Sequence, residues 1–419
     1  MAFLLYALPG CRTGAPASLA EVHGVVPADW PAGIAGPLAV PIPADLAAHK
    51  TLSAEVEIAR EPKARAITLQ AQPFAGPSGG AQAWMIFTPV ADDAGRPVTI
   101  RFKTAPPPER STMSAGIEGP EVKLANDSQP ILTYWHGVRS YQSPKAAKPW
   151  PLTDFIHPII GLDGETLTDF APADHRHHRG IFWAWVRHEQ AGRKVGDWWI
   201  PNNMECDPGD VSGLSGPVFA GFEASHLLKG ISSDNKTLEP FLRTDVRCRA
   251  FPITSDVRAI DIDLSLSAAA DDVRIGGTLT LDKGYGGMTV RCAPMKDIRI
   301  EADGEVLDKD GVQYRARWAD FSGIVVGPDG KPLPRRSGIA AMAHPKHPEY
   351  PPAWLLRFYG VISVSWPGLE MVDIPRDKPI HLYYRLIVHR GDAGEADIES
   401  RYRIYAADWR WRIAGAAGP

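Results

Sequence analysis

The chain has 419 residues, of which 44% are hydrophobic and 22% charged. These proportions are typical of a folded globular protein and argue against a disordered or fibrous one. The net charge is −4, with acidic and basic residues interleaved. The sequence therefore lacks the basic stripe that nucleic-acid binding requires, and we expect no nucleic-acid partner.

The amino terminus, "MAFLLYALPGC", is a short apolar run that ends in a cysteine. It resembles a truncated signal sequence with a lipoprotein box, in which Cys11 would carry a lipid anchor. We therefore expect residues 1–24 to be a signal or flexible segment and the protein to be periplasmic or outer-surface, the alternative being a cytoplasmic protein with an unstructured terminus. No apolar stretch approaches the roughly 18 residues of a membrane span.

Apolar and polar residues alternate in several segments, which predicts half-buried strands. In residues 259–267, for example, Ile260, Ile262 and Leu264 share one face. Helical spacing is not sustained over three turns, and Gly and Pro number 39 each, which disfavours helices. The predicted strands are residues 52–60, 66–72, 259–267, 276–282, 288–292, 297–303 and 381–390.

The expected fold class is all-β, a large antiparallel two-sheet (super)sandwich preceded by a smaller β-sandwich. A proline-rich stretch predicts where the two meet, because consecutive prolines form a semi-rigid spacer. We expect the small β-sandwich over residues 25–105, a linker over 106–120 and the large domain over 121–412. The cysteines Cys11, Cys206, Cys248 and Cys292 are far apart, so neither a zinc knuckle nor a disulfide is predicted.

The stretch "ADHRHHRG", residues 173–180, is the strongest candidate for chemistry. A metal site would need converging imidazoles, with His175, His177 and the distant His344 as candidate ligands beside Asp174. An acid–base centre needs only one histidine whose tautomer a carboxylate fixes, here His177 or His178 oriented by Asp174. The third interpretation is an ordinary turn in which these side chains bond to backbone carbonyls.

Other stretches supply candidate binding residues. "TYWHGVRSY" combines flat rings with hydrogen-bond donors, which suits a sugar ring, although the rim of a core is an equal alternative. "AHPKHPEYPPAWLLR" is a stiff, proline-rich loop, and stiff loops position functional groups well. The candidate catalytic residues are His177, His178, Asp174 and His344; the candidate substrate-binding residues are Tyr134, Trp135, His136, Arg139, Arg179, Trp183, Arg291, Trp354 and Arg357.

Several of these pieces resemble the bacterial family named methane oxygenase PmoA. They include "TYWHGVRSYQSP", "APADHRHHRGIFWAW", "KGYGGMTVR" and "AHPKHPEYPPAW", within residues 125–395. A membrane methane monooxygenase subunit would need transmembrane helices, which this sequence lacks. The large body is also similar to the galactose mutarotase-like supersandwich. That resemblance implies a carbohydrate ligand in a cleft lined by histidines and carboxylates.

The sequence therefore favours an exported carbohydrate-active enzyme that acts on a sugar or keto sugar by histidine acid–base catalysis. The reaction could be elimination, hydration, isomerisation or hydrolysis, and none of these requires a cofactor. A non-catalytic carbohydrate-binding protein is the first alternative. The second is a hydrolase or oxygenase that uses a divalent metal held by the histidines.

Overall fold

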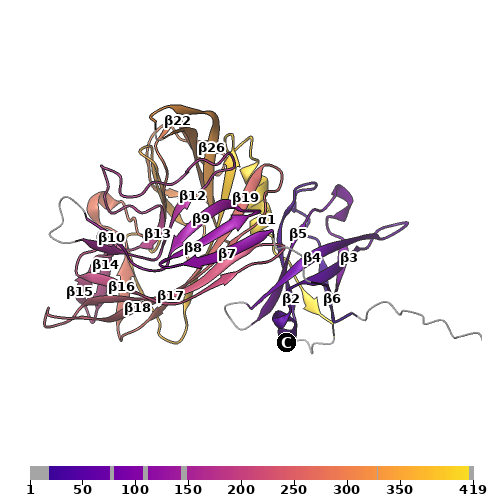
Figure 1. Cartoon of the computed structure of the whole chain (residues 1–419), viewed down its shortest axis with the longest axis horizontal. Helices are drawn as coiled ribbons and strands as arrows, with labels where there is room; N and C mark the ends of the chain where they lie inside the picture. Colours follow the sequence, from indigo (N-terminus) through magenta and orange to yellow (C-terminus); the bar gives the residue numbers. More distant parts are fainter. Residues whose placement is uncertain (1–17, 76–79, 107–111, 143–148, 328, 415–419) are drawn as a thin grey trace, which may run out of the picture.

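The computed structural model describes residues 18–75, 80–106, 112–142, 149–327 and 329–414. Two bodies lie side by side: a small one formed mainly by the first 105 residues, and a large one formed by most of the remaining chain (Figure 1). Nearly all the regular structure is antiparallel strand. The helices of the described residues are α1 (Ile398–Ala406) and three 3-10 turns, Ala44–Ala48, Ala91–Asp93 and Thr280–Asp282.

The small body is a sandwich built around one long strand, β4 (Arg65–Ala75). The first part of β4 pairs with β3 (Leu52–Ile58), and its last four residues pair with β5 (Ala81–Phe87). The sheet therefore turns over on itself and buries an apolar core. The full order is β2-β5-β4-β3-β6-β1-β31, with β2 Gly36–Ile42, β6 Pro97–Thr104, β1 Ala20–Val25 and β31 Arg412–Ile413.

The large body contains two nine-stranded sheets. The first has the order β24-β27-β28-β21-β13-β12-β9-β8-β7: Gly311–Arg315, Ala353–Arg357, Val361–Ser365, Gly287–Arg291, Ile181–Ala184, Phe155–Ile159, Gln129–Trp135, Glu121–Asn126 and Met113–Glu118. The second has the order β16-β17-β18-β19-β30-β26-β25-β22-β23: Met204–Leu214, Ala220–Ile231, Leu238–Ala250, Val257–Ala268, Ile380–Arg390, Pro332–Ala343, Trp318–Val326, Met295–Ala302 and Glu305–Val306.

Two smaller sheets complete this body. A four-stranded sheet has the order β15-β14-β20-β29, with strands Arg193–Gly196, Arg187–Gln190, Val273–Gly276 and Met371–Asp373. A hairpin joins β10 (Arg139–Tyr141) to β11 (Trp150–Leu152).

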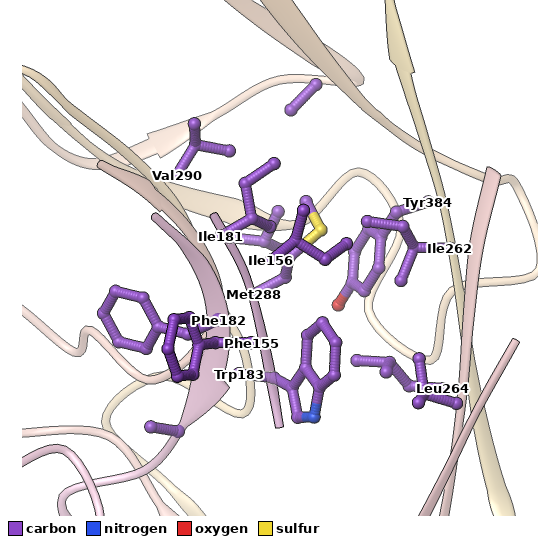
Figure 2. Close-up of a cluster of buried hydrophobic side chains, with 14 of the residues drawn as sticks. Phe155, Ile156, Ile181, Phe182, Trp183, Ile262, Leu264, Met288, Val290 and Tyr384 are labelled. Atoms are coloured by element: carbon purple, nitrogen blue, oxygen red, sulfur yellow. The ribbon is translucent and has the colours of Figure 1, made fainter. Parts of the chain in front are cut away.

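The main core lies between the two nine-stranded sheets. Figure 2 shows Ile156, Ile181 and Trp183 of the first sheet facing Leu264 and Tyr384 of the second. Each is almost fully buried, and a buried apolar side chain of this size stabilises the fold by about 1.5–3 kcal/mol. Because side chains alternate along a strand, Phe155 and Phe182 point to the outer face of the first sheet.

The two bodies pack through a further apolar cluster. Phe74 and Trp84 of the small sandwich contact Phe219 and Phe251 of the large body, with ring centroids 5.9 and 5.5 Å apart. The buried Gln72 side chain accepts hydrogen bonds from the backbone N–H groups of residues 218 and 219. The C-terminal strand β31 returns to the small sandwich, so the last residues assigned to the large domain contribute to the smaller one.

The all-β prediction is confirmed. Residues 276–282 were expected to form a strand, but only Gly276 does; the rest form a loop with the 3-10 turn, and Leu281 is exposed with a positive φ. Within the expected linker, residues 113–118 form strand β7, because they pair with β8. The described cysteines, Cys206, Cys248 and Cys292, are free and buried.

The predicted signal segment up to residue 17, with its anchor at Cys11, and two of the linker prolines lie outside the described residues. No helix in the described ranges is long and apolar enough to cross a membrane.

Candidate functional site

The DHRHH stretch, residues 174–178, lies in the loop between β12 and β13, at one end of the first nine-stranded sheet. The strand register brings distant segments to this end. Ile181 at the start of β13 pairs with Val290, and Arg291 at the end of β21 pairs with Val361. The turn between β27 and β28, which carries Tyr359, therefore lies beside the DHRHH loop.

Backbone hydrogen bonds fold this loop into successive turns. The His175 N–H donates to the Pro172 carbonyl at 3.1 Å, and the His178 N–H donates to the His175 carbonyl at 2.9 Å. Gly180 closes the loop with a φ of 65°, and a Cβ there would lie 2.2 Å from the Ile156 carbonyl oxygen. Only glycine fits this position, because both the conformation and the space exclude a side chain.

Asp174 joins a histidine to an arginine. Its Oδ2 lies 3.0 Å from Nδ1 of His175, and its two oxygens accept hydrogen bonds from Nη2 of Arg291 at 3.0 and 3.1 Å. Burial alone would raise the pKa of Asp174, but the bonds and charges of His175 and Arg291 outweigh it and lower that pKa. The carboxylate is therefore ionised at neutral pH. The histidine that it contacts is His175 rather than the predicted His177 or His178.

Tyr359 lies at the centre of this group. The His175 ring stacks on it with centroids 4.8 Å apart and planes 8° apart. The guanidinium carbons of Arg291 and Arg357 lie 5.3 and 5.5 Å from its ring centre, and Arg357 is held by Asp310, 3.2 Å from its Nε. The side chain of His175 remains 34% exposed and that of Asp174 44%. The group therefore opens to solvent and holds two cations beside one histidine.

The other two histidines of the loop are more enclosed. His178 stacks under His175 with centroids 4.6 Å apart, and His177 meets His178 edge-on at 4.7 Å. Burial, together with the neighbouring cationic groups, lowers the pKa of His177 to about 3 and lowers that of His178 well below its usual value. Both rings are neutral at physiological pH. As neutral imidazoles they can donate or accept a hydrogen bond, but they carry no imidazolium proton that could act as a general acid.

Arg179 points away from this group into the protein. Its side chain is fully buried, with its guanidinium carbon 4.6 Å from the centre of the Phe182 ring and 5.2 Å from that of Trp198. Burial lowers its pKa to about 10, which still leaves it charged at neutral pH. Arg179 therefore supports the loop from beneath and cannot reach a molecule at the surface in this conformation.

The three candidate metal ligands do not converge. His175 and His177 are neighbours, but His344 follows β26 of the second nine-stranded sheet and packs against Tyr405, with ring centroids 5.1 Å apart. Among the described residues, no group of three or more His, Cys, Asp or Glu side chains is arranged to hold a metal ion. The residues present do not fit the predicted metal centre, and His344 does not belong to the DHRHH group.

Three predicted binding residues are core residues instead. Tyr134, Trp183 and Trp354 are at most 2% exposed. The Trp354 indole donates to the Ala316 carbonyl, and Tyr134 and Trp183 both donate to the buried Asp154 carboxylate, at 2.6 and 2.8 Å. Their polar atoms are satisfied within the protein, so none of them can contact a ligand.

The rest of the TYWHGVRSY stretch lies beside the loop rather than in it. The Trp135 indole donates to the His157 carbonyl, and Arg139 stacks over Phe170 with its guanidinium carbon 3.9 Å from the ring centre. His136 contacts the Gly119 carbonyl at 3.1 Å. Of the predicted binding residues, the structure therefore brings Arg291 and Arg357 to Asp174, and leaves Trp135, His136 and Arg139 outside the group.

Sequence reasoning missed part of this neighbourhood. Tyr359 was not selected, although it follows Arg357 in the same loop. Trp199 is a buried core residue, and its ring centroid lies 5.8 Å from that of His178 and 4.6 Å from that of Tyr285. Burial raises the pKa of nearby Asp197 to about 6. Aromatic residues next to glycine-rich turns, as in "GDWW" and "KGYGG", were the available signal.

Comparison with known protein families gives a match to this sequence. The family of unknown function DUF6807 matches residues 121–403, which include the whole DHRHH group. The chain belongs to this family. No curated protein matches the chain.

A solved structure similar to this DUF6807 protein is a protein in the glycosyl hydrolase family 38 from Enterococcus faecalis. The two are 10% identical with a TM-score of 0.40, and the match covers 94% of this chain and 47% of that one. The chain thus spans about half the length of that protein, and a TM-score of this size does not establish a common fold.

Proposed function

We propose that this DUF6807 protein is a carbohydrate-active enzyme in which His175, oriented by Asp174, transfers a proton at a sugar or keto sugar. One observation carries the proposal: Asp174 contacts both Nδ1 of His175 and the guanidinium of Arg291, while His175 remains partly open to solvent. A carboxylate, an imidazole and a cation in this order form an acid–base centre beside a charge-stabilising group.

The chemistry follows from the two nitrogens of His175. Because Nδ1 faces Asp174, the ring presents Nε2 to a substrate, and the carboxylate stabilises the imidazolium that forms when Nε2 accepts a proton. On a keto sugar, Nε2 would take the proton from the carbon beside the carbonyl; the electron pair of the C–H bond would form a C=C bond, and the π pair of the carbonyl would move to its oxygen. Arg291 and Arg357 would stabilise this oxyanion.

The surroundings suit a sugar. Tyr359 is 39% exposed and offers a flat ring beside the histidine. Nε and Nη1 of Arg291 are buried and have no hydrogen-bond partner among the described residues, so the guanidinium has donors that no group of the protein uses. The resemblance to the galactose mutarotase-like supersandwich also favours a carbohydrate ligand, and export of the protein stays part of this proposal.

Solvent exchange tests the proposal without knowledge of the final product. The protein is incubated in heavy water with a 3-keto-glucoside, and proton NMR follows the signals of the hydrogens next to the ketone. We expect enzyme-dependent loss of one of these signals, or an elimination product. His175→Gln should slow the reaction by about a hundredfold or more, the usual contribution of a positioned acid–base group.

His136→Gln is the matched control, because His136 lies outside the group and should leave the rate unchanged. Equal rates for wild type and His175→Gln would contradict the assignment of His175. Saturable binding of the keto sugar without exchange or elimination would select the non-catalytic binding protein instead.

A further inference from the structure

A cavity lies between the two bodies, away from the DHRHH loop. Its volume is about 640 Å³, within the range of small-molecule sites. Four parts of the chain line it: the small sandwich with Trp30 and Trp84, strands β18, β19 and β30 with Arg249, the loop after β26 with His344, and the end of α1 with the segment that follows it, which carries Trp409 and Trp411. In Figure 1, α1 lies at this junction.

The aromatic side chains of this cavity form an ordered group. Trp409 and Trp411 stack in parallel with centroids 4.6 Å apart, and Trp30 meets Trp409 edge-on at 5.3 Å. Arg249 covers the Trp84 ring, with its guanidinium carbon 4.7 Å from the ring centre. Flat rings of this kind are suited to the apolar face of a sugar ring.

Hydrogen-bond donors of the lining are left without acceptors. The indole nitrogens of Trp84, Trp409 and Trp411, the Tyr405 hydroxyl and Nε of Arg249 are all buried and have no partner within the described part of the chain. Trp84 is only 8% exposed and Arg249 only 4%. Because buried polar groups are normally satisfied, such a concentration of unmet donors indicates a missing acceptor.

The charges of the lining balance. Arg249 donates to Asp263 at 2.5 Å, and Arg385 holds Asp261 through two bonds of 2.6 and 2.9 Å. Lys346 and Asp408 add one charge of each sign. A phosphate or sulfate would need a net positive site, so a neutral ligand rich in oxygen fits better.

His344 also lines this cavity and supplies a neutral hydrogen-bond donor. Its Nδ1 accepts a hydrogen bond from the backbone N–H of residue 346 at 3.1 Å, which leaves the proton on Nε2. Burial lowers the pKa of His344 to about 4, so the ring is neutral at physiological pH. It presents one more uncharged donor beside Tyr383 and Tyr405.

We propose that this cavity, the junction cavity, is a second carbohydrate site that binds a neutral saccharide of about two sugar units. The tryptophan rings would stack on the sugar, and its hydroxyl oxygens would accept from the unmet indole, phenol and guanidinium donors. The cavity lies on the outer face of the second nine-stranded sheet, whereas the DHRHH loop lies at the end of the first. The site is therefore independent of the proposed reaction.

Tryptophan emission provides the test, because four indoles lie in the lining. The whole protein is titrated with cellobiose, maltose and trehalose, and with AMP and sulfate for comparison. We expect a saturable change with at least one disaccharide. The double variant W84F/Y405F keeps an aromatic ring at both positions, although a smaller one at residue 84, and removes two donors, so it should weaken binding about fivefold to fiftyfold.

The Tyr405→Phe change should not lower the stability, because the hydroxyl lacks a partner in the free protein, whereas Trp84→Phe leaves a smaller ring against Phe251 and should cost about 1–3 kcal/mol. If the double variant fails to fold, Trp411→Ala replaces it, with a loss of affinity of about threefold to tenfold expected from the stacking alone. Asp174→Asn should bind the disaccharide as wild type does.

Three results would overturn the proposal. The first is that none of the three disaccharides binds. The second is that binding survives in W84F/Y405F and is lost in Asp174→Asn, which would place the sugar at the DHRHH loop. The third is that AMP or sulfate binds while the disaccharides do not.

Discussion

Two carboxylates of the large body, Asp154 and Asp174, have similar neighbours and opposite surroundings. Asp154 is buried and accepts from Tyr134, Trp183 and Thr244 at 2.6 to 2.9 Å, with Nδ1 of His226 at 3.5 Å. Asp174 also contacts a histidine, but its side chain is 44% exposed, and its other partner, Arg291, keeps unused donors.

The difference teaches how to separate structure from function in this protein. A carboxylate whose oxygens are filled by buried donors holds the core together and has no capacity left for a ligand. A carboxylate that orients a partly open histidine retains that capacity. Residue types alone do not make this distinction, because both centres contain aspartate, histidine and aromatic residues.

The largest effect expected of a single substitution is on stability at Asp154. Asp154→Ala leaves the Tyr134 hydroxyl and the Trp183 indole unpaired in the core, which should lower the free energy of unfolding by about 3–5 kcal/mol. Urea denaturation measures the loss. Asp154→Asn is the control, since it retains an acceptor and tolerates the positive φ of this position, and it should cost about half as much or less. A loss below about 1 kcal/mol for Asp154→Ala would remove the distinction between the two carboxylates.

Acid should destabilise the protein through its enclosed histidines. Burial lowers the pKa of His157 and His347 to about 4 and of His177 and His188 to about 3, whereas the same rings in the unfolded chain titrate near 6.5. The unfolded chain therefore binds protons first as the pH falls. Stability should be full above pH 6.5 and decline toward pH 4, by about 1.4 kcal/mol per pH unit for each histidine.

Asp197 works in the opposite direction, because its raised pKa of about 6 adds stability as the pH falls below that value. Burial also lowers the pKa of His178 and His344, and it raises the pKa of Asp169 and Asp263; the histidines outnumber these carboxyl groups, so the net change is a loss. Urea denaturation at a series of pH values measures how steeply the free energy of unfolding falls with pH. His157→Gln removes one of the titrating rings and should reduce that slope by about 1.4 kcal/mol per pH unit. A stability that does not change between pH 7 and pH 5 would contradict the assigned burial of these rings.

A small effect is expected on stability at the open centre. Asp174→Asn should lower the free energy of unfolding by about 1–2 kcal/mol, because the amide oxygen still accepts from Arg291, whose side chain is only 7% exposed. The same urea denaturation measures it. A loss as large as that of Asp154→Ala would show that the DHRHH loop depends on this carboxylate for its structure.

The smallest effect is expected at Tyr359. Tyr359→Phe keeps the ring on which His175 stacks, so the exchange rate with the keto sugar should stay within about threefold of wild type. Tyr359→Ala removes the ring and should slow exchange by about tenfold. Equal rates for wild type and Tyr359→Ala would show that the ring does not position the histidine.

Local patterns predicted the fold better than the site. Alternation found β19 because Ile260, Ile262 and Leu264 face the core, but it could not show that Asp261 of the same strand is also buried, through its pairing with Arg385 under the small sandwich. The segment 276–282 alternates as well, yet its glycines and the positive φ of Leu281 form a loop.

The DHRHH loop was recognised from its residue types, but its partners were not. Arg291 lies 117 residues from Asp174 and reaches it only through the register of β13 and β21. His344 looked equally suitable, and the fold places it in the junction cavity. Choosing His175 over His177 and His178 required the direction of each side chain, which depends on the turns of the loop.

The most direct test of the Asp174–His175 centre measures deuterium exchange into a 3-keto-glucoside for wild type, His175→Gln and Asp174→Asn, with the urea stability of each protein measured in parallel. We predict losses of rate of about a hundredfold or more in both variants, with stability within about 2 kcal/mol of wild type. Unchanged exchange in both stable variants would contradict the account and leave Asp174 with a structural role, like that of Asp154.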